Sequence, residues 1–312
     1  MTTAIAHPNI ALVKYWGKVP GADNIPASPS LSITLDTLRT HTRIETSNED
    51  LVIINGKPVD DPKISKFLMR LRQVHTIPPL TIDTDNNFPT GAGLASSASG
   101  FAALITAINS HCQLGLSHED CSTWARRGSG SAARSLCGGF STLTEPLWHA
   151  QTLLDPGMWP LHVVIAITDT SVKSVSSTAG MERSRLTSPF YDAWLASTRI
   201  AYERARTAVL ARDFNGLATI AEASALNMHA VMLSSQPPLM YWNSGTMAAI
   251  QRITGLREQG LAVFFTIDAG PQIKAVCLPE ASVTVERALR ETPGILGVTT
   301  AGLGQAARVI HA

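Results

Sequence analysis

Hydrophobic and polar positions alternate in the first third of the chain, as in strands that bury one face. Residues 31–38 alternate apolar and polar side chains, residues 42–46 continue the alternation, and residues 51–56 end in Asn55-Gly56. The Asn-Gly pair favours the tight turn of a hairpin. These segments predict an antiparallel meander, and residues 80–85 predict a further strand.

A helical period separates these strands and later replaces them. Ile64, Phe67, Leu68 and Leu71 share one face of a helix predicted over residues 63–74. An almost continuous apolar run at residues 161–168 is typical of a strand buried on both faces. Further helices are predicted over residues 99–114, 118–127, 129–136, 189–212, 214–232 and 247–260, and a hairpin over 261–278 with its turn at 269–271. The change near residue 180 predicts two domains, residues 1–180 and 181–312.

A Gly/Ser-rich loop leads from the strand at residues 80–85 into the next helix. Gly91 and Gly93 allow sharp turns, the helix start offers unpaired N–H groups to an anion, and Ser96 and Ser97 add hydroxyls for phosphate or Mg²⁺. The loop lacks the lysine of a Walker P-loop and the glycine spacing of a dinucleotide fold. It predicts a phosphate site of another class, and the same pattern also fits an ordinary helix cap.

Composition narrows the classes of protein that remain. The 312 residues are 45% hydrophobic and 16% charged with a net charge of +1, which predicts a globular protein and argues against nucleic-acid binding. The four cysteines form no C-x-x-C pair, and the histidines form no H-x-x-x-H pattern, so a structural zinc site is not expected. With neither a signal peptide nor a membrane span in the pattern, we expect a cytoplasmic protein with no membrane partner.

Three other segments contain side chains suited to an anionic ligand. Lys14 lies among apolar residues, so it is either a surface side chain or a charge held in a pocket. Residues 126–134 combine a Gly/Ser turn with three arginines, which fits an anion site or a plain serine-capped helix. Asp268 follows an apolar run and precedes Ala269-Gly270, where an aspartate is either functional or a turn former.

Together these segments resemble the diphosphomevalonate decarboxylase family, within the galactokinase, homoserine kinase, mevalonate kinase and phosphomevalonate kinase superfamily. Seven motifs occur in family order along essentially the whole chain. They are N-I-A-x-x-K-Y-W-G-K at residues 9–18, N-F-P-T-x-A/G-G-L-A-S-S-A at 87–98, R-x-G-S-G-S-A-x-R-S at 126–135, V-S-S-x-x-G-M at 175–181, M-H-A at 228–230, Q-P-P at 236–238 and F-T-x-D-A-G-P at 265–271.

The resemblance implies ATP-dependent decarboxylation of mevalonate 5-diphosphate to isopentenyl diphosphate, in the mevalonate route of isoprenoid biosynthesis. By similarity, Asp268 is the base or positioning carboxylate for the 3-hydroxyl group. Arg134 holds the substrate carboxylate, and Lys14 balances negative charge at the reacting centre. The expected cofactors are ATP and Mg²⁺, and a homodimer is expected.

The resemblance also assigns binding residues. For the substrate and its diphosphate they are Tyr15, Lys18, Ser129, Gly130, Ser131, Arg134 and Ser177. For ATP they are Pro89, Gly91, Gly93, Leu94, Ala95, Ser96, Ser97 and Lys173, with Ser96 and Ser97 also placed near the metal.

The implied fold is α+β, the two-domain small-molecule kinase fold. Its N-terminal half is like domain 2 of ribosomal protein S5, its C-terminal half is ferredoxin-like, and the active site lies in the cleft between them. The chain departs from the family at Thr178, where several bacterial relatives carry an arginine. The alternatives are a sister enzyme, either a decarboxylase of mevalonate 5-phosphate or a mevalonate 3-kinase, and a catalytically silent nucleotide-binding relative.

Overall fold

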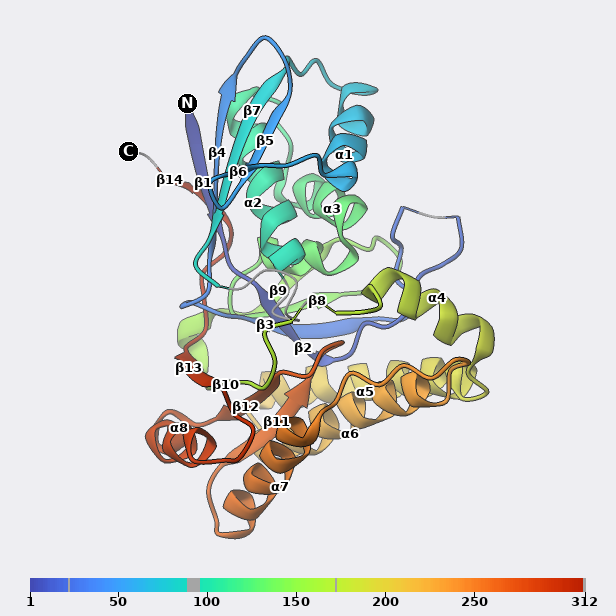
Figure 1. Cartoon of the computed structure of the whole chain (residues 1–312), viewed down its shortest axis with the longest axis vertical. Helices are drawn as coiled ribbons and strands as arrows, with labels where there is room; N and C mark the ends of the chain where they lie inside the picture. The colour runs from blue at the N-terminus through green and yellow to red at the C-terminus, as the bar shows by residue number, and fades with distance from the viewer. Residues whose placement is uncertain (22, 89–95, 172, 311–312) are drawn as a thin grey trace.

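A computed structural model describes residues 1–21, 23–88, 96–171 and 173–310 of the chain. Within them, three β-sheets are arranged along the long axis of the molecule, with helices packed beside each sheet (Figure 1). The largest sheet has six strands in the order β14 (Arg308–Ile310), β1 (Thr2–Ala6), β4 (Thr40–Thr46), β7 (Leu80–Asn86), β5 (Leu51–Ile54) and β6 (Lys57–Pro58). The strand next to the N-terminus and the strand next to the C-terminus therefore pair with each other.

Three helices cover one face of the six-stranded sheet: α1 (Pro62–Arg72), α2 (Ser96–His111) and α3 (His118–Gly128). Asp61 caps α1 by accepting from two backbone N–H groups, and Ser117 and Asp120 form a capping box at α3. The apolar faces of these helices and of the sheet form one buried core. The short 3₁₀ helix η1 (Gly130–Leu136) follows α3 directly.

The second sheet has four strands in the order β2 (Asn9–Val13), β3 (Ser30–Thr34), β8 (Phe140–Leu143) and β9 (Ala150–Leu154). Helices α5 (Tyr191–Ala211) and α6 (Phe214–Leu233) pack against it and share its core, below it in the view of Figure 1. Helix α4 (Ser177–Thr187) precedes them.

The third sheet has the order β11 (Val263–Ile267), β12 (Ile273–Cys277), β10 (His162–Ile167) and β13 (Gly297–Ala301), with all pairs antiparallel. Helices α7 (Ser244–Glu258) and α8 (Ser282–Arg290) bury apolar residues against it. The remaining 3₁₀ turns are η2 (Pro156–Met158) and η3 (Pro279–Ala281).

Most predicted elements are found close to their expected positions. The mixture of helices with largely antiparallel sheets confirms the α+β class, and the hairpin of β11 and β12 is present. Asn55 and Gly56 both have positive φ, at 50° and 74°, so the Asn-Gly turn between β5 and β6 is confirmed.

The predicted meander is wrong, because β3 and β4 belong to different sheets. Between them, Leu35 donates to the Pro8 carbonyl and Asp36 donates to the Gly302 carbonyl, each at 3.1 Å, and the chain passes from one sheet to the other. Strand β5 then pairs with β7 in parallel. Alternation marks a strand with one buried face, but it does not identify the neighbouring strand.

The division at residue 180 stays a prediction, and the strand pairing bears on it. Strand β10 precedes residue 180 but pairs with β12 and β13, whereas β14 near the C-terminus pairs with β1.

Among the helices of the described residues, none is both long and apolar enough to cross a membrane.

Candidate active site

A cavity of about 760 Å³ brings together every predicted site residue that the structure describes. These residues come from loops, from helix starts and from the ends of strands in all parts of the chain. They are Lys14, Tyr15, Lys18, Ser96, Ser97, Ser129, Gly130, Ser131, Arg134, Lys173, Ser177 and Asp268. The other predicted residues, Pro89, Gly91, Gly93, Leu94 and Ala95, lie outside the described residues.

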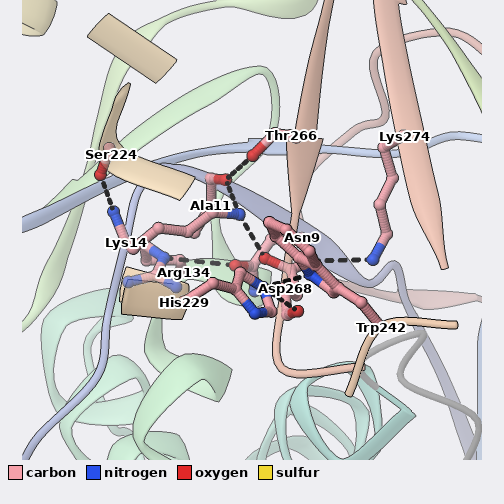
Figure 2. Close-up of polar contacts among 10 residues, drawn as sticks. All are labelled: Asn9, Ala11, Lys14, Arg134, Ser224, His229, Trp242, Thr266, Asp268 and Lys274. Carbon is pink, nitrogen blue, oxygen red and sulfur yellow. Dashed lines mark hydrogen bonds and ion pairs between the residues drawn. The ribbon is translucent and has the colours of Figure 1, made fainter. Parts of the chain in front are cut away.

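An ion pair between Lys14 and Asp268 lies in this cavity (Figure 2). Lys14 follows the end of β2, and Asp268 follows the end of β11, so two strand ends carry the pair. The Lys14 Nζ donates to Asp268 Oδ1 and to the Ala11 carbonyl, both at 2.7 Å. The Lys14 side chain is 1% exposed and that of Asp268 is 24% exposed, so the carboxylate is the more accessible partner.

Lys274 on β12 forms a second ion pair with the same carboxylate. Its Nζ lies 3.1 Å from Asp268 Oδ2, and its side chain is also buried. Sequence reasoning missed this residue. A signal was available, because Lys274 is a single charge in the apolar strand 273–278 and follows Asp268 by six positions.

These neighbours set the charge states of the site. Burial alone raises the pKa of Asp268, but Lys14 and Lys274 outweigh it and hold the pKa of this carboxyl well below its usual range. Burial lowers the pKa of Lys14 to about 8, although the neighbouring Asp268 carboxylate acts to raise it. Asp268 is therefore ionised at neutral pH, and Lys14 carries its charge up to about pH 8.

Arg134 reaches the cavity from η1 with its guanidinium anchored on β2 and β3. Its Nε donates to Asn9 Oδ1 at 3.2 Å, and one terminal nitrogen donates to the Ser30 hydroxyl. Asn9 is held in turn, because its amide donates to the Ser131 carbonyl at 2.9 Å and to the Ser135 hydroxyl at 2.8 Å. Burial lowers the pKa of Arg134 to about 10, so it remains a cation at neutral pH.

Tyr15 packs closely against Gly130 on the wall of the cavity. A Cβ atom at Gly130 would lie 2.1 Å from the Tyr15 hydroxyl, so any other residue there requires the tyrosine side chain to move. That hydroxyl has no hydrogen-bond partner within the described part of the chain, and burial raises the pKa of Tyr15. A buried, unpaired hydroxyl at a cavity wall is suited to a ligand.

Two lysines lie at the start of α4. The Lys173 Nζ donates to the Ser177 hydroxyl at 3.0 Å and to the Ala269 carbonyl at 2.8 Å. The Lys18 Nζ donates to the Thr178 hydroxyl at 3.3 Å, so a lysine approaches the position where the expected arginine is absent.

The cavity carries an excess of positive charge. Among the described residues that line it, the carboxylates are Asp23 and Asp268, and Asp23 is already paired with Arg70 and Arg127. The starts of helices α2 and α4 also open into it through Ser96, Ser97 and Ser177. The lining cations are Lys14, Lys18, Lys63, Lys66, Arg70, Arg127, Arg134 and Lys173. Such a lining fits ligands with several phosphate groups.

The donors suit a metal held mainly by a ligand's oxygens. Within the described residues, no group of three or more His, Cys, Asp and Glu side chains could hold a metal ion. Hydroxyls such as those of Ser96 and Ser97 can complete the shell of an ion that phosphates already bind.

His229 on α6 supports the Asp268 turn and was not assigned a role from the sequence. Its Nε2 lies 3.2 Å from the Asp268 carbonyl and 3.3 Å from Trp242 Nε1 (Figure 2). Burial lowers the pKa of His229 to about 3, so the ring is neutral. The M-H-A motif marked this position, but only the fold shows what the ring contacts.

Comparison with protein families identifies both parts of the chain. Residues 6–151 match the diphosphomevalonate decarboxylase-like N-terminal domain, and residues 163–292 match the mevalonate 5-diphosphate decarboxylase C-terminal domain. The chain is 35% identical over 295 residues to diphosphomevalonate decarboxylase from Candida albicans, covering 84% of this chain and 80% of that protein. It is 34% identical over 315 residues to the enzyme from Saccharomyces cerevisiae, covering 89% and 78%.

Solved structures give the same result. The mevalonate diphosphate decarboxylase from Staphylococcus aureus matches with a TM-score of 0.92 at 32% identity, over 99% of this chain and 98% of that one. The enzyme from Enterococcus faecalis matches with a TM-score of 0.89 at 33% identity, over 100% and 99%. These matches confirm the fold and the resemblance expected from the motifs, and the chain therefore belongs to the diphosphomevalonate decarboxylase family.

Proposed function

We propose that this cavity carries out the reaction of the family, the ATP-dependent decarboxylation of mevalonate 5-diphosphate to isopentenyl diphosphate, ADP, phosphate and CO₂. The observation that carries the proposal is the Lys14–Asp268 pair inside a strongly cationic cavity. A related structure in complex with MVAPP, AMPPCP and magnesium matches with a TM-score of 0.90 over 100% of this chain, at 34% identity. That likeness supports mevalonate diphosphate, ATP and Mg²⁺ as the ligands here.

Asp268 receives the 3-hydroxyl group of the substrate. Its carboxylate accepts a hydrogen bond from that hydroxyl and orients the oxygen for phosphoryl transfer. Because its pKa is held well below the usual range, Asp268 is a weak base before transfer begins. This favours a positioning carboxylate over one that removes the proton early. Lys14, on the same carboxylate, balances the charge that develops during transfer.

Arg134 binds the substrate carboxylate that leaves as CO₂. A planar guanidinium can hold a carboxylate by two parallel bonds, and Asn9 and Ser30 fix its orientation. Phosphate loss gives positive character at C3, and departure of CO₂ neutralises it. The diphosphate of the substrate binds along the remaining wall, at Tyr15, Lys18, Ser129, Gly130, Ser131 and Ser177.

Lys173, Ser96 and Ser97 hold the nucleotide phosphates and the Mg²⁺ ion. When bound, ATP supplies the phosphoryl group that turns the 3-hydroxyl into a leaving group. A helix start favours anions, and the two serine hydroxyls at the start of α2 suit a magnesium shell. Lys173 also donates to the carbonyl of Ala269, the residue after Asp268, so it joins the nucleotide side to the catalytic turn.

A coupled assay tests this function by following ADP and CO₂ together with ATP, Mg²⁺ and each mevalonate derivative. One CO₂ per ADP with mevalonate 5-diphosphate is expected. Turnover only with mevalonate 5-phosphate would identify the sister decarboxylase, and ADP without CO₂ would identify a 3-kinase. No ADP with any derivative would identify a silent nucleotide-binding relative.

A cytoplasmic location, expected from the sequence pattern, and a homodimer, which the resemblance implies, are also part of the proposal. All four cysteines are free thiols, as expected in a reducing compartment. Cell fractionation tests the location, and sedimentation velocity tests the homodimer.

A further inference from the structure

Two buried lysines bind the catalytic carboxylate, and they occupy different places. Lys14 lines the cavity, whereas Lys274 is not among the described residues that line it. We propose that Lys274 is a positioning residue, which keeps the Asp268 carboxylate ionised and oriented while Lys14 engages the transferring phosphoryl group. This inference rests on the proposed function.

The strand that carries Lys274 gives no packing reason for a charge. In β12 all five residues are buried, and the other four are apolar. Lys274 lies opposite Thr266 of β11 and Ile165 of β10, in the interior of the sheet. A lysine buried there is costly unless its charge is paired, and its ammonium forms an ion pair with Asp268. Its position is therefore explained by the carboxylate.

The two lysines contact different oxygens of the Asp268 carboxylate. Lys14 holds Oδ1 at 2.7 Å and Lys274 holds Oδ2 at 3.1 Å, so each oxygen has its own cation. Figure 2 shows the two side chains reaching Asp268 from different sides. A phosphoryl group in the cavity can share the Lys14 ammonium, but Lys274 lies behind the carboxylate and stays with it.

Other groups around Asp268 do not replace Lys274. Arg134 from η1 and Lys173 from the segment before α4 add positive charge near it, but in the described part of the chain their hydrogen bonds go to other groups. His229 from α6 is neutral and contacts the backbone carbonyl. When Lys14 turns toward the phosphoryl group, Lys274 is thus the remaining direct partner of the carboxylate in the described structure.

The test compares Lys274→Met, which keeps the length of the side chain without its charge, with Lys274→Arg, which keeps the charge. We expect Lys274→Met to lower kcat by about 10- to 100-fold while both KM values stay within about threefold. The acidic limb of its kcat profile should move up by about one pH unit or more, because burial raises the pKa of a carboxyl that has lost a cation. Lys274→Arg should restore much of kcat and return the acidic limb toward the wild-type position.

Val276→Ala is the matched control, since Val276 is buried two positions further along the same face of β12. It should lower the thermal midpoint with the acidic limb unchanged. If Lys274→Met keeps wild-type kcat and pH profile, the inference is wrong. Equal losses of kcat in Lys274→Met, Lys274→Arg and Val276→Ala, with the acidic limb of the kcat profile unchanged in each, would show that Lys274 has a structural role. That result would also overturn the inference. If the wild type itself releases no CO₂, the proposed function fails, which is a separate result.

Discussion

Replacing Asp268 by asparagine removes one charge from the site and keeps the shape of the side chain. The amide can still accept a hydrogen bond through its oxygen, but it cannot balance Lys14 and Lys274, which are both 1% exposed. The perturbation is therefore mainly electrostatic. It acts on the reacting hydroxyl group and on two buried cations at once.

The size of the effect follows from these contacts. A correctly placed catalytic carboxylate contributes about 10²–10⁴ in rate, so kcat should fall by about 10³-fold, or roughly 4 kcal/mol of transition-state stabilisation. KM should change much less, because the proposed diphosphate and nucleotide contacts come from other residues. Losing one partner of a buried ion pair typically costs about 3–5 kcal/mol of stability. Asp268 is 24% exposed, so we expect a loss of folding stability near the lower end of this range.

The assay measures ADP and CO₂ in parallel, with a thermal melt of each variant. Asp83→Asn is the control, because Asp83 is a carboxylate in a surface ion pair with Arg43 and does not line the described cavity wall. It should keep the wild-type rate. An Asp268→Asn variant that is folded and retains more than about a tenth of wild-type kcat would refute the role given to the carboxylate. A rise in KM alone would instead place Asp268 in substrate binding.

Three further predictions follow from the same cavity. Arg134→Lys keeps the charge but loses the planar fork, so we expect kcat/KM for mevalonate 5-diphosphate to fall by about 10- to 100-fold in steady-state assays, and an unchanged value would contradict the carboxylate contact. Burial lowers the pKa of Lys14 to about 8, so kcat/KM should be full below that pH and fall as the pH rises through it. Lys14→Arg should remove this alkaline limb, whatever its effect on the maximum rate, and a limb that stays near pH 8 would assign it to another group. Gly130→Ala places a methyl group 2.1 Å from the Tyr15 hydroxyl, so KM for the substrate should rise by about tenfold or more, and a wild-type KM would show that the wall can move.

Local patterns in the sequence were sufficient for many of the helices and for some of the strands, whereas the proposed catalytic residues came from the family resemblance. The helical period over residues 63–74 corresponds to α1, and the paired apolar runs near the C-terminus correspond to β11 and β12. Lys14, Arg134 and Asp268 are proposed because each lies in a short motif shared with the family. The motifs propose which side chains take part, and the structure adds that all three line one cavity.

Long-range pairing and the support of the site were not accessible in this way. The alternating strands β3 and β4 are neighbours in sequence but belong to different sheets, and nothing in their pattern shows it. Lys274 and His229 both contact Asp268, and no pattern in the sequence shows those contacts. An isolated charge in an apolar strand can be noticed in the sequence, but the fold shows that it lies beside the proposed catalytic carboxylate.

The separation of the partners along the chain ties activity to complete folding. The bond from Lys14 to Asp268 joins positions 254 residues apart, and the bond from Arg134 to Asn9 spans 125 residues. The Lys14 backbone also donates to the Ser224 hydroxyl on α6, so one segment is held from two directions. Because β2 and β11 belong to different sheets, a shift of one sheet against the other would separate Lys14 from Asp268 without unfolding either sheet. Loss of turnover should therefore precede loss of secondary structure on heating, since the proposed catalytic pair is also a contact between the two sheets.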